Sequence, residues 1–116
     1  MKMKELDEQI YEVDKKVWRI TRLIQLASEL KSFKIPLKHL SIYSLYPKFD
    51  SGSPTNEFVD YIRSINSSDL SYPIILDDEG YVMDGRHRVF KSMLENKESI
   101  LAVRFDKTPE CDFIKE

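Results

Sequence analysis

Five consecutive residues, Asp84-Gly85-Arg86-His87-Arg88, hold the side chains of this 116-residue chain that are best suited to binding a charged ligand. Two guanidinium groups and an imidazole follow a carboxylate and a glycine. Apolar residues then recur at one-turn spacing, which predicts a helix; they are Val89, Phe90, Met93 and Leu94. The three cationic residues therefore stand where a strand ends and a helix begins.

Cations are unusual in the first turn of a helix. That turn has N–H groups without intrahelical partners and a partial positive charge, so it favours Asp or Glu. Each exposed cation placed there costs about 0.3–1 kcal/mol, and a bound phosphate or carboxylate would reverse the sign. The alternative is that Asp84 pairs with one of the arginines. Gly85 fits either a close approach to a ligand or a positive φ angle at the junction.

A β-hairpin is predicted immediately before this segment. Two apolar runs, Pro73–Leu76 and Tyr81–Met83, flank the turn sequence Asp77-Asp78-Glu79-Gly80. A nuclease would require several clustered carboxylates to hold two metal ions, and only this turn is dense enough in the sequence. We interpret it as a solvent-facing turn that delivers the chain to the cationic segment.

The order of apolar strand, acidic-Gly turn, apolar strand, Asp-Gly-x-His-Arg, helix and strand resembles the ParB N-terminal/sulfiredoxin-like superfamily. The resemblance covers about residues 35–105, with Ile35–Leu40 similar to the opening strand and Asn56–Ile65 to the helix before the hairpin. It implies an α+β domain with a small mixed sheet and packed helices. It also implies that the segment from Gly85 to Arg88 binds nucleotides or phosphates.

Two departures from that family limit what the resemblance implies. Sulfiredoxin has its catalytic cysteine at the position of Arg86, so repair of oxidised peroxiredoxin is not expected. ParB partition proteins continue into a helix-turn-helix DNA-binding domain, and this chain ends shortly after its last predicted strand. The expected protein is a stand-alone nucleotide-binding core, similar to family members that resemble free-amino-acid kinases.

The resemblance and the residue types together give a set of candidate site residues. The loop 46–55 would face the helix start, where cations hold phosphates in phosphoryl transfer and Mg²⁺ accompanies a nucleoside triphosphate. No metal site on the protein itself is predicted. The candidates for phosphate binding are Gly85, Arg86, His87, Arg88, Lys48 and Ser51, and those for catalysis are Asp84, His87 and Glu57.

A long amphipathic helix is predicted over residues 4–31. Its apolar positions alternate between steps of four and three, the spacing of a coiled-coil seam; they are Leu6, Ile10, Val13, Val17, Ile20, Ile24 and Ala27. A helix of this span is about 42 Å long, so we expect it to project and to form a homodimer or bind a partner protein. The alternative is packing against its own domain.

Composition and charge set the remaining expectations. The net charge is −2 and the pI about 5.7, so the chain has no basic field to hold DNA, and nucleic-acid binding is possible but not favoured. Trp18 lies among basic residues, which we interpret as a solvated face. A single cysteine and the lack of a long apolar run predict a cytoplasmic protein that does not bind membranes. The predicted organisation is a helix over 1–33, a domain over 34–106 and a loose acidic tail over 107–116.

Three functions remain open from the sequence. The first is a nucleotide- or phosphate-binding domain with weak nucleotidase or phosphotransferase activity. The second is a non-enzymatic phage or plasmid accessory protein that acts through its N-terminal helix. The third is a DNA-associated nuclease or regulator.

Overall fold

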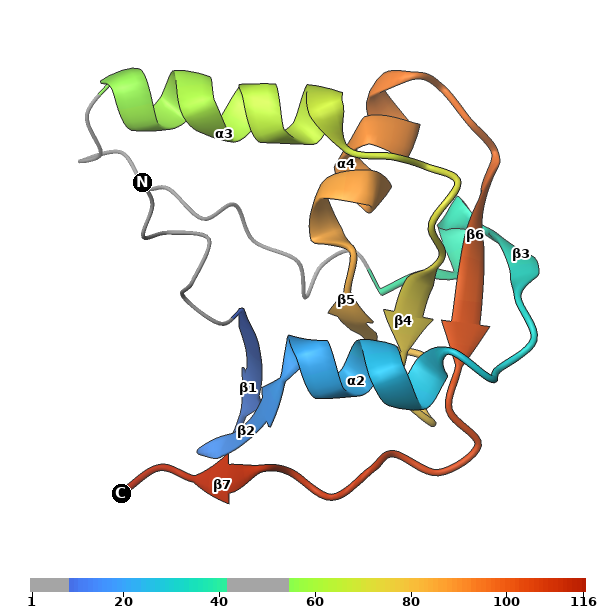
Figure 1. The fold of residues 1–116 in the computed structure, drawn as a ribbon. Helices are drawn as coiled ribbons and strands as arrows, with labels where there is room; N and C mark the ends of the chain where they lie inside the picture. The colour runs from blue at the N-terminus through green and yellow to red at the C-terminus, as the bar shows by residue number, and fades with distance from the viewer. Residues whose placement is uncertain (1–8, 42–54) are drawn as a thin grey trace.

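The computed structural model describes residues 9–41 and 55–116, which form an α+β fold with two small sheets and three α-helices (Figure 1). None of the helices in these ranges has the length and hydropathy needed to cross a membrane. The elements are β1 (Ile10–Val13), β2 (Lys16–Arg19), α2 (Ile20–Ala27), β3 (Phe33–Pro36), a 3-10 turn η1 (Leu37–His39), α3 (Thr55–Ser67), β4 (Ile74–Leu76), β5 (Val82–Asp84), α4 (Arg86–Leu94), β6 (Ser99–Arg104) and β7 (Phe113–Ile114).

The larger sheet has the strand order β3-β6-β4-β5. β4 runs parallel to β6, and the other two pairings are antiparallel, so the sheet is mixed as predicted. All three residues of β4 are buried because this strand is covered on both faces. Since neighbouring side chains on a strand point to opposite faces, Ile75 joins one core cluster while Ile74 and Leu76 join the other.

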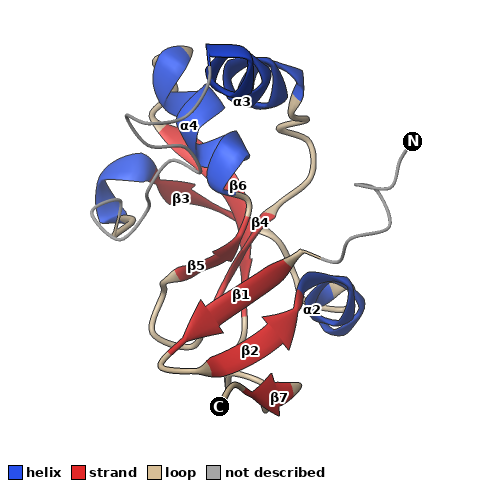
Figure 2. Ribbon diagram, turned by 90° about the vertical axis from the view of Figure 1, so that its left-hand side faces the viewer, coloured by secondary structure: helices blue, strands red, loops and turns tan. Residues whose placement is uncertain are grey.

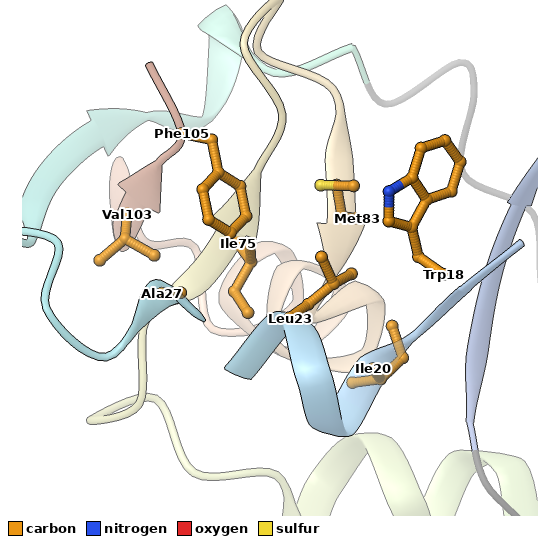
Figure 3. Packing of buried hydrophobic residues seen from close by; sticks show 8 residues of the cluster. All are labelled: Trp18, Ile20, Leu23, Ala27, Ile75, Met83, Val103 and Phe105. Carbon is orange, nitrogen blue, oxygen red and sulfur yellow. The ribbon is translucent and has the colours of Figure 1, made fainter. Parts of the chain in front are cut away.

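One face of the larger sheet packs against α2 and the β1–β2 hairpin. Figure 3 shows the side chains that meet there; the cluster comprises Trp18, Ile20, Leu23, Ala27, Ile75, Met83, Val103 and Phe105. This cluster takes residues from both sides of the boundary predicted at residue 33. The N-terminal segment and the sheet therefore share one core.

The opposite face packs against α4 and η1. Its cluster comprises Leu40, Ile74, Leu76, Val82, Val89, Ile100 and Ala102. α3 packs on α4 and forms the outermost layer on this side, next to α4 in both ribbon views (Figures 1 and 2). The sheet is thus followed outward by α4 and then by α3.

The predicted β4–β5 hairpin is confirmed, and two carboxylates of its acidic turn accept hydrogen bonds from the backbone. The Oδ1 atom of Asp77 accepts the backbone N–H groups of Glu79 and Tyr81, both at 2.9 Å. Asp78 and Thr108 exchange two side-chain-to-backbone hydrogen bonds of 3.0 and 3.1 Å. The carboxylate of Asp77 therefore stabilises the turn, and that of Asp78 links the turn to the segment that contains Thr108. This agrees with a structural role for the turn.

The predicted long helix over residues 4–31 is wrong. Its central part is the hairpin of β1 and β2, and over residues 9–31, which the structure describes, the α-helical part is α2. Asp14 and Lys15 form the two-residue turn with φ angles of 51° and 69°, the left-handed conformations that a type I′ hairpin requires. Leu6 lies outside the described residues.

Side-chain pairing explains why this segment forms strands. β-Branched and aromatic residues favour strands, and Tyr11 lies opposite Trp18 in the hairpin with ring centroids 5.6 Å apart. Trp18 is then buried in the core with Ile20 and Ala27. Val17 is fully buried as well. Val17, Ile20 and Ala27 of the expected coiled-coil seam are therefore inside the protein's own fold, whereas Ile10, Val13 and Ile24 are exposed.

The expectation of a loose C-terminal tail is also wrong. β7 pairs with β2, so the tail supplies the third strand of the smaller sheet. The indole Nε1–H of Trp18 donates to the carbonyl of Pro109 at 2.8 Å, and the backbone N–H of Arg19 donates to Asp112 Oδ2 at 2.7 Å. Cys111 packs against the core cluster. Through these contacts, residues 106–116 stabilise the N-terminal hairpin.

The other predicted elements are found with adjusted limits. The helix expected over Asn56–Ile65 is α3, and the strand expected after α4 is β6. The opening strand expected over Ile35–Leu40 is β3, which ends at Pro36 and gives way to η1, and Leu40 is buried. On α4 the expected apolar stripe is partly wrong, because Met93 and Leu94 are exposed. α4 buries Val89, which belongs to that stripe, and Ser92, which does not.

Candidate functional site

β5 passes the chain to α4 through Gly85, which has φ 111° and ψ 19° and occupies the N-cap position. A β-carbon at this position would lie 2.5 Å from Cγ2 of Ile74 and 2.9 Å from its Cβ. Left-handed backbone and close packing therefore both require glycine here. Of the two explanations open from the sequence, the backbone geometry of the junction is sufficient to account for Gly85.

Asp84 and Arg88 form an ion pair across one turn. Nη2 of Arg88 lies 3.0 Å from Oδ2 of Asp84, and the two side chains are only 16% and 17% exposed. Nη1 of Arg88 also donates to the carbonyl of Tyr72 at 3.5 Å. Local charge pairing thus accounts for Arg88, and the candidate catalytic carboxylate of Asp84 is engaged in holding it.

Arg86 differs from Arg88 in its surroundings. It is the first residue of α4 and is partly buried. Within the described residues it forms no ion pair, and its Nε atom is buried with no hydrogen-bond partner. An unsatisfied buried donor costs about 1–3 kcal/mol, and more when it is charged. Arg86 is therefore the guanidinium of this segment whose charge the described residues do not neutralise.

The first turn of α4 adds further positive potential. The N–H of Val89 makes a helical hydrogen bond to the carbonyl of Gly85 at 3.0 Å. The amides before it have no acceptor within the helix. The turn contains no acidic residue, and Gly85 offers no side-chain cap. Helix dipole and Arg86 therefore act together at one end of the helix.

His87 points toward α3. Its ring meets the ring of Tyr61 edge to face, with centroids 5.1 Å apart and planes at 87°. The Nε2 atom is buried in this contact. The imidazole is thus part of the packing between two helices.

The remaining predicted residues are not brought into the same cluster. Glu57 is exposed in the first turn of α3, one turn before Tyr61, and makes no ion pair or side-chain hydrogen bond within the described residues. Lys48 and Ser51 lie outside those residues. The structure therefore brings together Asp84, Gly85 and the three cations, and it leaves the loop contribution of the predicted site undescribed.

Three neighbours of the cationic segment, Tyr72, Lys91 and Asp69, were not predicted from the sequence. Tyr72 supplies its carbonyl to Arg88, and Nζ of Lys91 donates to the carbonyl of Ser68 at 2.7 Å. The hydroxyl and the backbone N–H of Ser71 donate to the carboxylate of Asp69. These two hydrogen bonds lower the pKa of Asp69 below its ordinary 3.8, with smaller contributions from the charges of Lys91 and Arg88. Only Lys91 had a sequence signal, because it follows His87 by one helical turn.

The described residues contain no group of three or more His, Cys, Asp or Glu side chains placed to hold a metal ion. The carboxylate nearest to the cations, Asp84, is already paired with Arg88. An Mg²⁺ ion brought by a nucleoside triphosphate would therefore rely on the phosphates and water for its ligands as far as these residues are concerned. The donor set fits an anion better than a resident cation.

Comparisons with known proteins add no relative: no family model, no curated protein and no solved structure matches this chain. A functional assignment accordingly depends on the geometry around α4.

Proposed function

We propose that this protein binds the phosphate group of a nucleotide at the N-terminus of α4. The observation that carries the proposal is the partly buried guanidinium of Arg86, which has no partner among the described residues and lies at an uncapped helix start. A helix N-terminus binds anions through its free N–H groups and its partial positive charge. Arg86 adds a planar set of donors that matches two phosphate oxygens.

Each residue of the segment has a distinct part in this proposal. Gly85 allows the sharp entry into α4, and the amides of the first turn donate to phosphate oxygens. Arg86 makes the charged contact, while Arg88, held by Asp84, contributes to the local potential. Lys48 and Ser51 are expected to add contacts by the resemblance to ParB/sulfiredoxin-like domains, and membership of this superfamily is part of the proposal.

Binding is better supported than turnover. Phosphoryl transfer requires a carboxylate that positions the nucleophile, and Asp84 is engaged with Arg88 at 3.0 Å. Glu57 makes no ion pair within the described ranges, and no contact described there joins it to the cationic segment. We therefore propose a binding module, with Mg²⁺ as the companion of a triphosphate and no catalytic step assigned to it.

A thermal-shift screen tests the proposal. ATP, CTP, GTP and inorganic phosphate, each with and without Mg²⁺, are added to the wild type, to Arg86→Gln and to Arg63→Gln. Arg63 is the matched control, an exposed arginine paired with Asp60 on α3. A ligand at 100 times its Kd adds about 2.7 kcal/mol of stability. We expect a shift for the wild type and Arg63→Gln and little for Arg86→Gln; equal shifts in all three would refute the role of Arg86.

A second candidate function is the binding of a partner protein through α3. Phe58, Val59 and Ile62 are exposed large apolar residues on this helix, and they line an open groove with Arg63 and Asn66. This retains the accessory-protein hypothesis but moves its surface from the N-terminal segment to α3. The nuclease hypothesis has no corresponding support, because the described carboxylates form no metal-binding group.

A further inference from the structure

β1 forms one margin of the smaller sheet. The strand order there is β1-β2-β7, and Figure 2 shows β1 and β7 on opposite sides of β2. β1 pairs with β2 in a regular antiparallel register. Among residues 9–41 and 55–116, no strand pairs with its other side. The backbone groups that β1 directs to that side therefore have no partner strand in this part of the chain.

The hydrogen bonds of β2 identify these groups. Opposite residues in an antiparallel pair alternate between those that bond to each other and those whose N–H and C=O point outward. The carbonyl of Val17 accepts the N–H of Asp112 at 2.7 Å, and the N–H of Arg19 donates to the Asp112 carboxylate. Both residues of β2 thus direct their backbone groups away from β1. Glu12 and Ile10 lie opposite them, so their own N–H and C=O groups face the outer edge of β1.

The other strand edges of the described residues have features that discourage further pairing. Proteins protect such edges with short strands, irregular pairing, lysine or proline. β3 contains Lys34 and Pro36, β5 has three residues and an irregular register with β4, and β7 has two residues followed by Lys115. β1 has four residues, no lysine and no proline, and its register is regular. It is therefore the edge that is best able to accept another strand.

We propose that β1 pairs with β1 of a second copy of this chain, antiparallel and about a two-fold axis at Tyr11. Ile10 of each copy lies opposite Glu12 of the other, and each of these pairs exchanges two backbone hydrogen bonds. Tyr11 lies opposite its own counterpart in a pair without hydrogen bonds, where side chains are closest and aromatic pairs are favourable. The two smaller sheets become one continuous sheet.

Symmetry and charge favour a second copy as the occupant of this edge. A two-fold interface requires a surface that is its own complement, and the outward groups of Ile10 and Glu12 meet this requirement. The carboxylate of Glu12 lies 2.9 Å from Nζ of Lys115, so the pairing introduces no uncompensated negative charge. Ile10 and Val13 are 44% and 42% exposed, and the second strand covers part of both. Because one short strand gives a small interface, the dimer is weak and reversible.

Analytical ultracentrifugation tests the dimer at protein concentrations from about 1 µM to 1 mM, the range in which weak complexes are half formed. The variants are Ile10→Pro and Ile10→Val. Proline is tolerated on an edge strand and removes an N–H that bonds to the second copy but not one that bonds to β2. Valine keeps that N–H and is the matched control. We expect wild type and Ile10→Val to approach twice the monomer mass at high concentration.

Ile10→Pro should raise the dissociation constant about tenfold or more, because each dimer loses two hydrogen bonds and leaves two carbonyls unpaired. A wild type that stays monomeric throughout would overturn the proposal and leave a strand of another protein as the occupant to seek. Dimerisation of folded Ile10→Pro as tight as that of the wild type would also overturn it.

Hydrogen exchange of the wild type, which needs no variant to fold, locates the interface. The amides of Tyr11 and Val13 bond within the hairpin and should be protected at every concentration. Those of Ile10 and Glu12 should exchange rapidly in dilute protein and become protected as the dimer forms. A dimer in which Ile10 and Glu12 stay unprotected would contradict pairing through β1 and place the interface elsewhere.

Discussion

Three neighbouring cations at the start of α4 have three different environments. Arg88 is paired with Asp84, His87 packs against Tyr61, and Arg86 has no partner among the described residues. The sequence predicted that the cations would gather at a helix start, and the one-turn spacing of Asp84 and Arg88 made pairing a readable alternative. It did not indicate that Arg86 would be left without a partner among the described residues, because that depends on how β5 enters the helix.

We expect replacement of Arg86 to affect the stability of the unliganded protein and its affinity for nucleotide differently. Arg86→Gln removes a cation from the first turn of a helix, which is worth about 0.3–1 kcal/mol, so we expect the unliganded variant to be at least as stable as the wild type in urea unfolding. Loss of a charged hydrogen bond costs about 1.5–3 kcal/mol; nucleotide affinity should therefore fall by about tenfold or more. A variant that is much less stable would show that Arg86 has a structural partner.

Gly85 is expected to be intolerant of substitution for reasons of backbone and space. An alanine there adds the strain of a left-handed residue, about 1–2 kcal/mol, to the overlap with Ile74, about 1–3 kcal/mol. Gly85→Ala should lower the free energy of unfolding by about 2–5 kcal/mol. Gly80→Ala is the control, since Gly80 has φ 92° but its nearest neighbour would be 3.9 Å away. Equal losses in both variants would show that packing on Ile74 is unimportant.

One substitution can distinguish the β1–β2 hairpin from the helix that the seam spacing predicts. Lys15 has a φ of 69° in the turn, where glycine is favoured, whereas glycine inside a helix costs about 1 kcal/mol. We expect Lys15→Gly to raise the free energy of unfolding by up to about 1 kcal/mol, and Lys16→Gly, in β2, to lower it. Destabilisation by Lys15→Gly, measured by thermal unfolding, would argue for a helix across this position.

The C-terminal segment should make the free energy of unfolding fall at low pH. The N–H of Arg19 donates to Asp112, which holds the pKa of this carboxyl below its ordinary 3.8, assisted by the charge of Arg22. A carboxyl with a lowered pKa in the folded state stabilises the protein above about pH 4 and loses this effect as the pH falls. Asp112→Asn should therefore lower the Tm at pH 6, and the difference from the wild type should shrink toward pH 2.5. A constant difference, or the same behaviour in Asp106→Asn, would contradict this.

Across the whole molecule, the sequence predicted best what local patterns determine. The β4–β5 hairpin, α4 and β6 follow from turn residues, apolar runs and helical spacing, and the mixed sheet of an α+β fold was expected. The N-terminal hairpin was missed because its apolar residues also fit the seam spacing of a helix, and β7 was missed because it pairs with the distant strand β2. The hydrogen bond from Arg19 to Asp112 joins residues 93 positions apart, and no local pattern signals it.

The candidate site shows the same division. Its composition was readable from Gly85 and the three cations, whereas the orientation of His87 toward α3 depends on packing between two helices. Glu57 and Tyr61 lie one turn apart on α3, yet among the contacts described for the two residues it is Tyr61 that meets the cationic segment. Proximity of residues to a motif could therefore be predicted only for those on the same element.

The most direct measurement is a titration of the wild-type protein with the nucleotide that gives the largest thermal shift, followed by backbone amide NMR. If the phosphate binds at the helix start, the resonances of Arg86, His87 and Arg88 should shift together and saturate, and inorganic phosphate should move the same signals at higher concentration. Saturating shifts elsewhere, with these three amides unmoved, would contradict phosphate binding at α4.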